Sequence, residues 1–248
     1  MEFVTGFLIA GAVGLTGVGA GSITAPILIL FFHLKPAVAV GTALTFAAVI
    51  KLAVVPIYLR RQQVSYRVLG LLCAGGIPGV VIGIQVLKRL SVEDHEREIF
   101  LLLGVLIIIL SLANLYRSLR PRLSTASADR SLWLPPIAAF IGAEVGVSSA
   151  GAGALGAVAL LTLTNLTPAL VVGTDLVFGL IVSTVGSGLH LFIGHYDSGV
   201  LIKLCIGGVL GAISGALLCS RIPSRALQVA LSMCLVGLGL QLCWKAFG

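Results

Sequence analysis

Long apolar segments, separated by short polar or turn-rich stretches, run through the whole chain. A helix that crosses the hydrocarbon core of a bilayer needs about 20 apolar residues, and most of the segments approach this length. They cover residues 2–22, 24–34, 36–59, 66–87, 99–116, 133–151, 153–166, 168–194, 199–219 and 226–247. The pattern predicts an all-α polytopic membrane protein whose apolar segments are helices.

Two of the segments, 24–34 and 153–166, are too short to span a bilayer. Each follows a glycine-rich break, at residues 17–21 and 148–153. Glycine is unfavourable in a helix by roughly 1 kcal/mol relative to alanine, so several together favour an unwound stretch. Each break therefore predicts a re-entrant hairpin, in which one helix enters the membrane and a short helix leaves on the same side.

The two halves of the chain match at a constant offset of 132 residues, with glycine, proline, threonine and cysteine kept in register. The matches include Gly19, Ala20, Gly21, Pro36, Gly41, Thr42, Cys73, Gly75 and Gly79 with Gly151, Ala152, Gly153, Pro168, Gly173, Thr174, Cys205, Gly207 and Gly211. We therefore predict two homologous repeats, residues 1–116 and 133–248, joined by a polar linker at 117–132. Each repeat would contain a broken hairpin followed by three transmembrane helices.

An odd number of crossings in each repeat would invert the second half relative to the first. Inversion places nine of the 16 basic residues in cytoplasmic loops, as the positive-inside rule favours. They are Arg60, Arg61, Arg67, Arg117, Arg120, Arg122, Arg130, Arg221 and Arg225. A parallel arrangement, which would put the last two outside, is the alternative. We expect inverted repeats and a cytoplasmic linker.

Composition agrees with the pattern, since 58% of the residues are hydrophobic and only 10% are charged. A soluble domain carries about 25% charged residues, so a soluble globule and a disordered chain are excluded. The net charge of +7 comes from basic clusters at segment ends, which indicates topology rather than nucleic-acid binding. All five cysteines lie in apolar segments without a CxxC motif, so we expect packing thiols and no metal or cofactor.

Glycines recur every four residues on two of the segments. They are Gly75, Gly79 and Gly83 in the first repeat and Gly207, Gly211 and Gly215 in the second. Such a stripe allows another helix to approach closely. The partner helix would belong to the same chain or, alternatively, to a second copy in a homodimer.

Few ionisable residues lie deep in the apolar segments; they are Lys51, Glu144, Asp175 and His190. An ionisable group at membrane depth is costly and lines a cavity or pairs with another group. One interpretation is a structural ion pair of Lys51 with Asp175 or Glu144. The other is an anion site at Lys51, with Glu144, Asp175 and His190 providing proton coupling.

The breaks also favour an anion site. A broken helix exposes unpaired N–H groups, and the short helix after it presents its positive end. Nearby hydroxyls would add donors, although helix-to-helix hydrogen bonding is their alternative role. The predicted anion-binding residues are Gly19, Ala20, Gly21, Ser22, Thr42, Lys51, Ser148, Ser149, Gly151, Ala152, Gly153 and Thr174.

These paired motifs resemble the sulfite exporter TauE/SafE family over essentially the whole chain. They read Gly17-Val-Gly-Ala-Gly-Ser22, Ala25-Pro26 and Ala39-Val-Gly-Thr42 in the first half, and Gly151-Ala-Gly153 and Val171-Val-Gly-Thr-Asp175 in the second. The resemblance implies movement of sulfite, sulfoacetate or other small organosulfur and carboxylate anions across the bacterial inner membrane. Together with the repeats, it leads us to expect a secondary transporter that moves a small sulfur-containing anion, such as sulfite or a sulfonate, by alternating access. The implied partners are this anion and the lipid bilayer; neither nucleic acid nor enzymatic activity is expected.

Two other functions compete with this interpretation. Glu144, Asp175 and His190 could serve a cation or metal permease, although the positive charge of Lys51 would oppose a cation nearby. Ser148 or Ser149 with His190 could form the Ser–His pair of an intramembrane serine hydrolase. The first repeat has Gly14-Leu-Thr-Gly17 at the place of the second repeat's Gly146-Val-Ser-Ser149, so duplication explains that feature better.

Overall fold

The computed structural model describes residues 2–16, 20–92, 96–119, 130–150, 153–194, 196–218 and 224–247, and these fold into helices joined by short connections. The helices are α1 (Glu2–Thr16), α2 (Ala20–Phe31), α3 (Pro36–Arg60), α4 (Tyr66–Val92), α5 (Glu96–Leu119), η1 (Ser131–Trp133), α6 (Leu134–Ser148), α7 (Ala154–Leu163), α8 (Pro168–Ile193), α9 (Ser198–Leu218) and α10 (Ser224–Lys245). Within these residues, four stretches are long and apolar enough to cross a membrane: Pro36–Arg60, Tyr66–Leu90, Ser131–Ser148 and Ala169–Ile193. The predicted all-α polytopic membrane protein is confirmed at this level.

The two longest central helices begin in the same way. Pro36 and Pro168 occupy the first turns of α3 and α8. The preceding residues, Lys35 and Thr167, are extended, with ψ of 142° and 151°. Proline favours the first helical turn and pushes the residue before it out of the helical region. The sequence therefore fixes where both helices start.

The short helices begin close to the predicted breaks, but α2 starts earlier than the pattern indicated. Ala20 and Gly21 belong to α2, whereas the sequence placed them in an unwound stretch. Gly21 lies in tight contact with the backbone of Ser149, so this glycine serves close packing within α2 rather than a break in the helix. With 12 and 10 residues, α2 and α7 are about 18 and 15 Å long, half the thickness of the hydrocarbon core.

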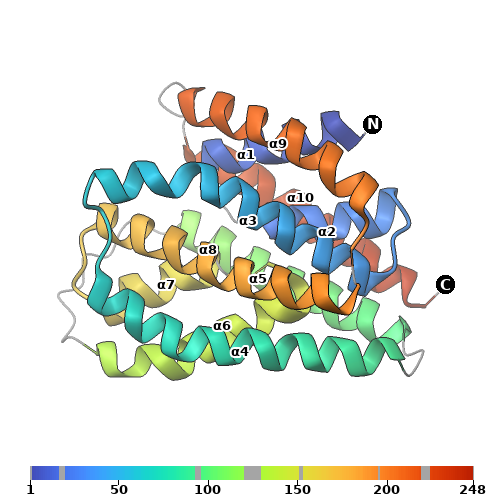
Figure 1. Cartoon of the computed structure of the whole chain (residues 1–248), viewed down its shortest axis with the longest axis horizontal. Coiled ribbons are helices and arrows are strands. Elements are labelled where there is room, and N and C mark those ends of the chain that lie inside the picture. The colour runs from blue at the N-terminus through green and yellow to red at the C-terminus, as the bar shows by residue number, and fades with distance from the viewer. Residues whose placement is uncertain are drawn as a thin grey trace.

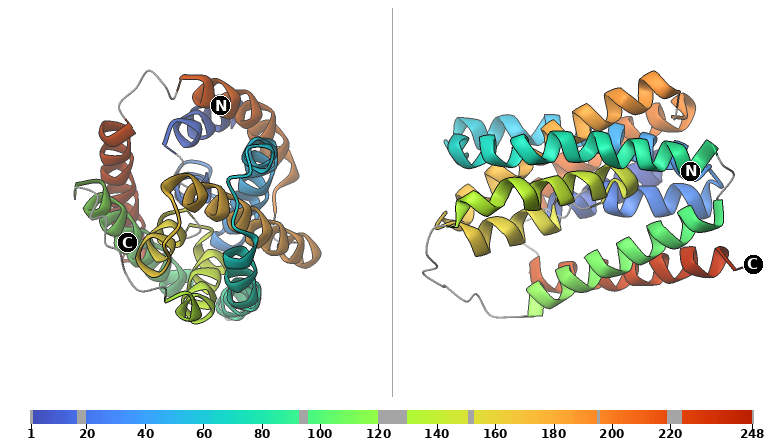
Figure 2. Two further views of the ribbon diagram at one scale, coloured as in Figure 1. Left: turned by 90° about the vertical axis from the view of Figure 1, so that its left-hand side faces the viewer. Right: turned by 90° about the horizontal axis from the view of Figure 1, so that it is seen from below.

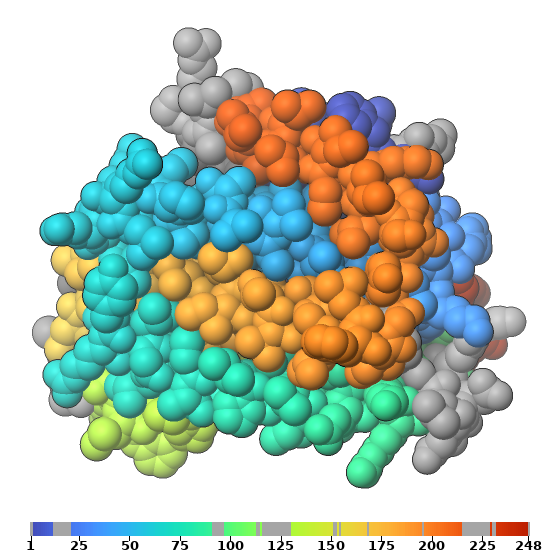
Figure 3. All heavy atoms as spheres, in the orientation of Figure 1, coloured from blue at the N-terminus to red at the C-terminus, as the bar shows by residue number. Residues whose placement is uncertain are grey.

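Helices α3 and α8 form the centre of the bundle and run antiparallel (Figure 1). In Figure 3, α8 lies as a band between α3 and α4. Three further pairs join the two halves: α1 packs on α9, α6 on α4, and α5 on α10, whereas the short helices α2 and α7 pack mainly on α3 and α8 of their own halves. The α5–α10 pair lies at one edge of the bundle (Figure 2). The halves are thus extensively interlocked.

The glycine stripes lie at the crossings of two of these pairs. A side chain at Gly75, Gly79 or Gly83 would meet a backbone carbonyl of α6 at 1.8–2.1 Å, and one at Gly207 or Gly211 would meet a carbonyl of α1 at 2.1 Å. The space beside each of these five glycines is therefore occupied by a helix of the same chain. This close backbone approach is what small residues permit at helix interfaces in membranes.

The two ends of the bundle differ in charge. The end of α3 and the start of α4 lie on the left in Figure 1, with Arg60, Arg61 and Arg67 exposed there. Arg130 lies at the same end, because its N–H donates to the carbonyl of Leu163 at the end of α7. Both chain termini lie at the opposite end, where Lys203 pairs with Glu2 at 3.4 Å.

Candidate functional site

A buried lysine lies between the two central helices. Lys51 of α3 is only 7% exposed, and its Nζ donates to the hydroxyl of Ser183 on α8 at 3.4 Å. Asp175, also on α8, is the acidic group whose negative charge acts on Lys51. A buried ammonium is unfavourable without such polar and charged neighbours. The arrangement therefore concentrates positive charge in the bundle interior, partly balanced by α8.

The second helix break contacts the beginning of α2. The hydroxyl of Ser149 donates to the Gly21 carbonyl at 3.1 Å, and the hydroxyl of Ser22 donates to the Ala150 carbonyl at 3.0 Å. A Cβ on Gly21 would lie 2.0 Å from the Ser149 carbonyl oxygen. This reciprocal pair of hydrogen bonds, which we call the break junction, joins the end of α6 to the first turn of α2, and it provides a partner for the Ala150 carbonyl, which lies beyond the end of α6.

Backbone strain is present at the same place. Ser149 has φ of 62°, the left-handed conformation that usually falls to glycine at the end of a helix. For a residue with a side chain this conformation costs on the order of 1 kcal/mol. The Ser149 side chain offsets this cost by its bond to Gly21. The serine thus ends α6 and joins the break to α2.

Glu144 is connected to the break junction through a serine. The Glu144 carboxylate is buried on α6 and accepts a hydrogen bond from the hydroxyl of Ser148. That hydroxyl in turn accepts from the backbone N–H of Ala150 at 3.2 Å. A change in the charge of Glu144 would therefore alter the hydrogen bonding of the backbone at the break.

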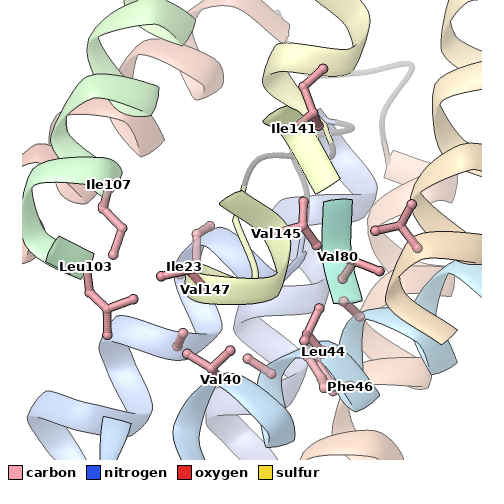
Figure 4. Packing of buried hydrophobic residues seen from close by; sticks show 14 of the residues in the cluster. Ile23, Val40, Leu44, Phe46, Val80, Leu103, Ile107, Ile141, Val145 and Val147 are labelled. Carbon is pink, nitrogen blue, oxygen red and sulfur yellow. The ribbon is translucent and has the colours of Figure 1, made fainter. Parts of the chain in front are cut away.

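Apolar side chains surround the end of α6. Val145 and Val147 lie among Ile23 of α2, Leu44 of α3 and Val80 of α4 (Figure 4). All five are buried. In such surroundings charges interact more strongly than in water, so the few polar groups of the junction dominate its electrostatics.

Asp175 lies against the first turn of α7. Its Oδ1 atom is 2.0 Å from the position that a Cβ on Gly156 would occupy, so the carboxylate fills the space that this glycine leaves. Asp175 is 6% exposed. A carboxylate beside the first turn of a helix is stabilised by the unpaired N–H groups there.

Thr42 and Thr174 dock loops of the opposite half. The hydroxyl oxygen of Thr174 accepts from the Ser65 N–H at 3.0 Å, and that of Thr42 accepts from the Asp197 N–H at 3.2 Å. Gly173 supports the bond between Thr174 and Ser65, because the carbonyl of Gln63 approaches to where a side chain at residue 173 would lie. The Gly-Thr motif therefore has a structural role in loop docking, whereas the sequence predicted anion binding by Thr42 and Thr174, with helix-to-helix hydrogen bonding as the alternative.

His190 is fully buried on α8. The single hydroxyl hydrogens of Ser148 and Ser149 are donated to Glu144 and to the Gly21 carbonyl, so neither serine donates to His190. The Ser–His pair of a hydrolase is therefore not formed. Among the described residues, no group of three or more histidine, cysteine or acidic side chains could hold a metal ion, so Glu144, Asp175 and His190 do not form a metal-binding group.

The structure thus brings together Gly21, Ser22, Ser148 and Ser149 at one junction, and it places Lys51 of α3 against α8, the helix that also carries Asp175. Gly19, Gly151 and Ala152 lie outside the described residues, and Gly153 precedes α7. Sequence reasoning missed Ser183 and Gly156. Both could have been found from the repeat, since Ser183 is the counterpart of Lys51 and Gly156 that of Thr24 at the 132-residue offset.

The apolar helices and their buried polar centre define a multi-pass membrane protein of the cell membrane. The chain belongs to the sulfite exporter TauE/SafE family, whose sequence model matches residues 2–242. It is 30% identical over 247 residues to the "Probable membrane transporter protein YjnA" of Bacillus subtilis (strain 168), with 96% of each chain covered. It is 24% identical over 266 residues to the "Probable membrane transporter protein YunE" of the same organism, with 96% of this chain and 95% of the relative covered. No solved structure matches the chain.

Proposed function

We propose that this protein is a secondary transporter that moves a small sulfur-containing anion, sulfite or a sulfonate, across the cell membrane by alternating access. Membership of the sulfite exporter TauE/SafE family supports the class of substrate, and two relatives named as membrane transporters support the class of protein. The observation that carries the proposal is Lys51, a cation buried between the two central helices. A buried cation in a membrane protein is a functional-site candidate.

The transporter is built from two inverted repeats, each with a re-entrant hairpin and three spans. Helices at the 132-residue offset run antiparallel, which supports inversion. So does the reciprocity of Thr42 with Asp197 and Thr174 with Ser65, because each bond is the other's counterpart at that offset. The arginine-rich end, with Arg60 and Arg130, faces the cytoplasm by the positive-inside rule.

The anion binds near the midplane, between the broken helices and Lys51. Ser22, Ser148 and Ser149 each donate their hydroxyl hydrogen within the protein, so these three are not donors to an anion in this conformation. Thr42 and Thr174 use their oxygens as acceptors, which leaves their hydroxyl hydrogens outside those bonds. Because these two threonines lie near the starts of the antiparallel helices α3 and α8, at opposite ends of the pair, they cannot both reach one small anion, and the donors are the Lys51 ammonium and N–H groups of the breaks.

Protons drive the cycle through Glu144, Asp175 and His190. All three are buried, and Glu144 connects through Ser148 to the backbone of the second break. Protonation of Glu144 would change the partner of the Ser148 hydroxyl and loosen the break. Transporters of this type bind their substrate at the interface of two repeats, which then rock against each other.

The test is anion flux into proteoliposomes that contain the purified full-length protein. The panel consists of sulfite, methanesulfonate, sulfoacetate and acetate, with protein-free liposomes as the background. We expect flux of at least one sulfur anion, stimulated by a proton gradient. We expect Lys51→Gln to lower this flux at least tenfold, whereas the exposed Lys203→Gln stays within twofold of wild type. Wild-type liposomes that pass none of the panel would contradict the proposal.

A further inference from the structure

The two halves differ at one buried pair of positions that faces the polar interior. In the second half, Asp175 of α8 places its carboxylate against Gly156 of α7. The counterparts in the first half, at the 132-residue offset, are Ala43 and Thr24, both fully buried. The first half therefore has a threonine and an alanine at the positions where the second half has a glycine and an acid. The fold thus contains a carboxylate position in one half only.

Gly156 is required for this position. A Cβ at residue 156 would lie 2.0 Å from Oδ1 and 3.2 Å from Cγ of Asp175. Any side chain at 156 would therefore displace the carboxylate from the first turn of α7. Gly156 is the third residue of this helix. Replacing it by a residue with a side chain would therefore also separate the Asp175 carboxylate from the N–H groups of that turn.

Asp175 also acts on the buried cation. Its negative charge interacts with Lys51 of α3, whose ammonium donates to Ser183 two turns further along α8. An anion arriving at Lys51 would be repelled by the charged Asp175. Charges interact more strongly in a poorly solvated interior than in water, so the two anions compete for one cation.

We propose that Asp175 is an internal counter-anion, positioned by the missing side chain of Gly156, and that a substrate anion binds at Lys51 as Asp175 takes up a proton. The proposal rests on the transport function proposed above and assigns its proton-linked step. The proton comes from the aqueous phase on the side from which the anion enters. The Asp175 carboxylate becomes a neutral carboxyl group, so the net charge of the interior is unchanged by binding one monovalent anion.

Other titratable groups surround α8 and must be separated from Asp175. Glu144 on α6 and His190 on α8 itself are buried, and Lys51 comes from α3. On α4, Arg67, Lys88 and Arg89 are exposed near the helix ends. Helix α7 carries no titratable residue between 154 and 163. A substitution at Asp175 therefore has to be compared with wild type at each pH, so that contributions of Glu144 and His190 cancel.

The first experiment tests the positioning of Asp175 without any ligand. The melting temperature of the purified full-length protein is measured for Gly156→Ala, Asp175→Ala and the double variant, with Gly188→Ala as the control. Gly188 lies on α8, and a Cβ there would meet nothing within 4 Å. We expect Gly156→Ala to lower the melting temperature by several degrees, and by much less in the Asp175→Ala background. Equal effects in both backgrounds would overturn the positioning role of Gly156.

The second experiment measures binding of methanesulfonate between pH 5 and 8 by calorimetry. This anion keeps a single negative charge over the range, so any pH dependence belongs to the protein. Uptake of one proton by Asp175 predicts that the slope of log Kd against pH is about one unit larger for wild type than for Asp175→Asn, by linkage. Equal slopes would overturn the proton-linked exchange while leaving the transport function intact. A wild type that binds no methanesulfonate and passes no sulfur anion would overturn the proposed function and the exchange with it.

Discussion

Lys51 donates a hydrogen bond to Ser183, the residue that stands 132 positions later and is its own counterpart in the second half. Two counterparts can touch only where the pseudo-symmetry axis passes between them. The buried cation therefore lies at the point where the two halves meet. The counterpart of Lys51 is a serine and not a second lysine, so this pair of positions contributes one positive charge at the axis. The two halves therefore differ at the place where both would contact a substrate.

This inequality predicts different results for two charge-altering variants. Ser183→Lys would bring a second ammonium against Lys51, which is unfavourable at close range, so we expect it to lower the melting temperature and to abolish flux. Ser183→Ala removes only the hydroxyl acceptor, and we expect less than a tenfold loss of flux. The measurement is proteoliposome flux at matched protein content. Full activity of Ser183→Lys would show that the two ammonium groups are not held close together.

The two threonine bonds predict opposite effects on access to the two membrane faces. Replacing Thr174 by valine leaves the Ser65 N–H without its partner, and Thr42→Val does the same for Asp197. An unsatisfied N–H costs roughly 1–3 kcal/mol when it is buried and less at half-buried positions such as these, and each variant loosens one end of the central helix pair. In an inverted transporter those ends open to opposite faces, so we expect the two variants to bias the protein in opposite directions.

The readout for the threonine variants is the labelling of single cysteines by a membrane-impermeant reagent from either side of a vesicle. Thr184→Val is the control, since its hydroxyl donates to the Leu180 carbonyl within α8. If both variants increased labelling from the same side of the vesicle, the two threonine bonds would not restrain opposite ends of the helix pair.

The break junction predicts that glycine is a better replacement for Ser149 than alanine. Ser149→Ala loses the hydrogen bond to Gly21 and keeps the unfavourable left-handed backbone, so we expect it to lose about 1–2 kcal/mol of stability. Ser149→Gly loses the same bond but relieves the backbone, so we expect a change close to zero. Denaturant or thermal unfolding of the purified protein measures the difference. Identical stabilities would indicate that the strain is absent.

The glycine stripes predict equal sensitivity at equivalent positions. A Cβ at Gly79 or Gly211 would lie 2.1 Å from a backbone carbonyl of the neighbouring helix. We expect Gly79→Ala and Gly211→Ala each to destabilise the protein by about 1–3 kcal/mol, the range for overpacking. Gly70→Ala on α4 is the control, because nothing lies within 4 Å of its Cβ position, and we expect it to be neutral or slightly stabilising. Thermal melting of the three variants distinguishes these outcomes.

The charge of the two bundle ends predicts the topology. Both termini lie at the end opposite the arginine-rich loops, so we expect them outside and the 117–132 linker inside. Alkaline phosphatase fused to the C-terminus should be active, and a cysteine at Ser127 should react only with reagents that enter the cell. Inactive C-terminal fusions would reverse the orientation.

Much of the helix order could be predicted from the sequence, because apolar length is a strong signal in a membrane protein. Pro36 and Pro168 even fixed where α3 and α8 start. The start of α2 was less predictable. Gly21 has a low helix propensity, yet it is helical, because the contact with Ser149 across 128 residues rewards the absence of a side chain.

The candidate site was predictable in its residue types but not in its contacts. The burial cost of Lys51 and Asp175 identified them as unusual residues. Their surroundings depend on which helices cross, and a sequence pattern does not contain that information. Gly156 illustrates the limit, since one glycine among 31 acquires its meaning only when the Asp175 carboxylate lies against it.

The sequence by itself determined that the chain is a helical membrane protein, that its halves repeat at an offset of 132 residues, and which charged groups are costly to bury. These properties follow from local composition and register. Only the tertiary structure decided that α1 packs on α9 and α4 on α6, and that the Gly-Thr motifs dock loops of the opposite half. The physical reason is that close packing and hydrogen bonding depend on the approach of segments far apart in the chain, from 60 residues for Gly75 and Pro135 to 155 for Thr42 and Asp197, which no local preference specifies.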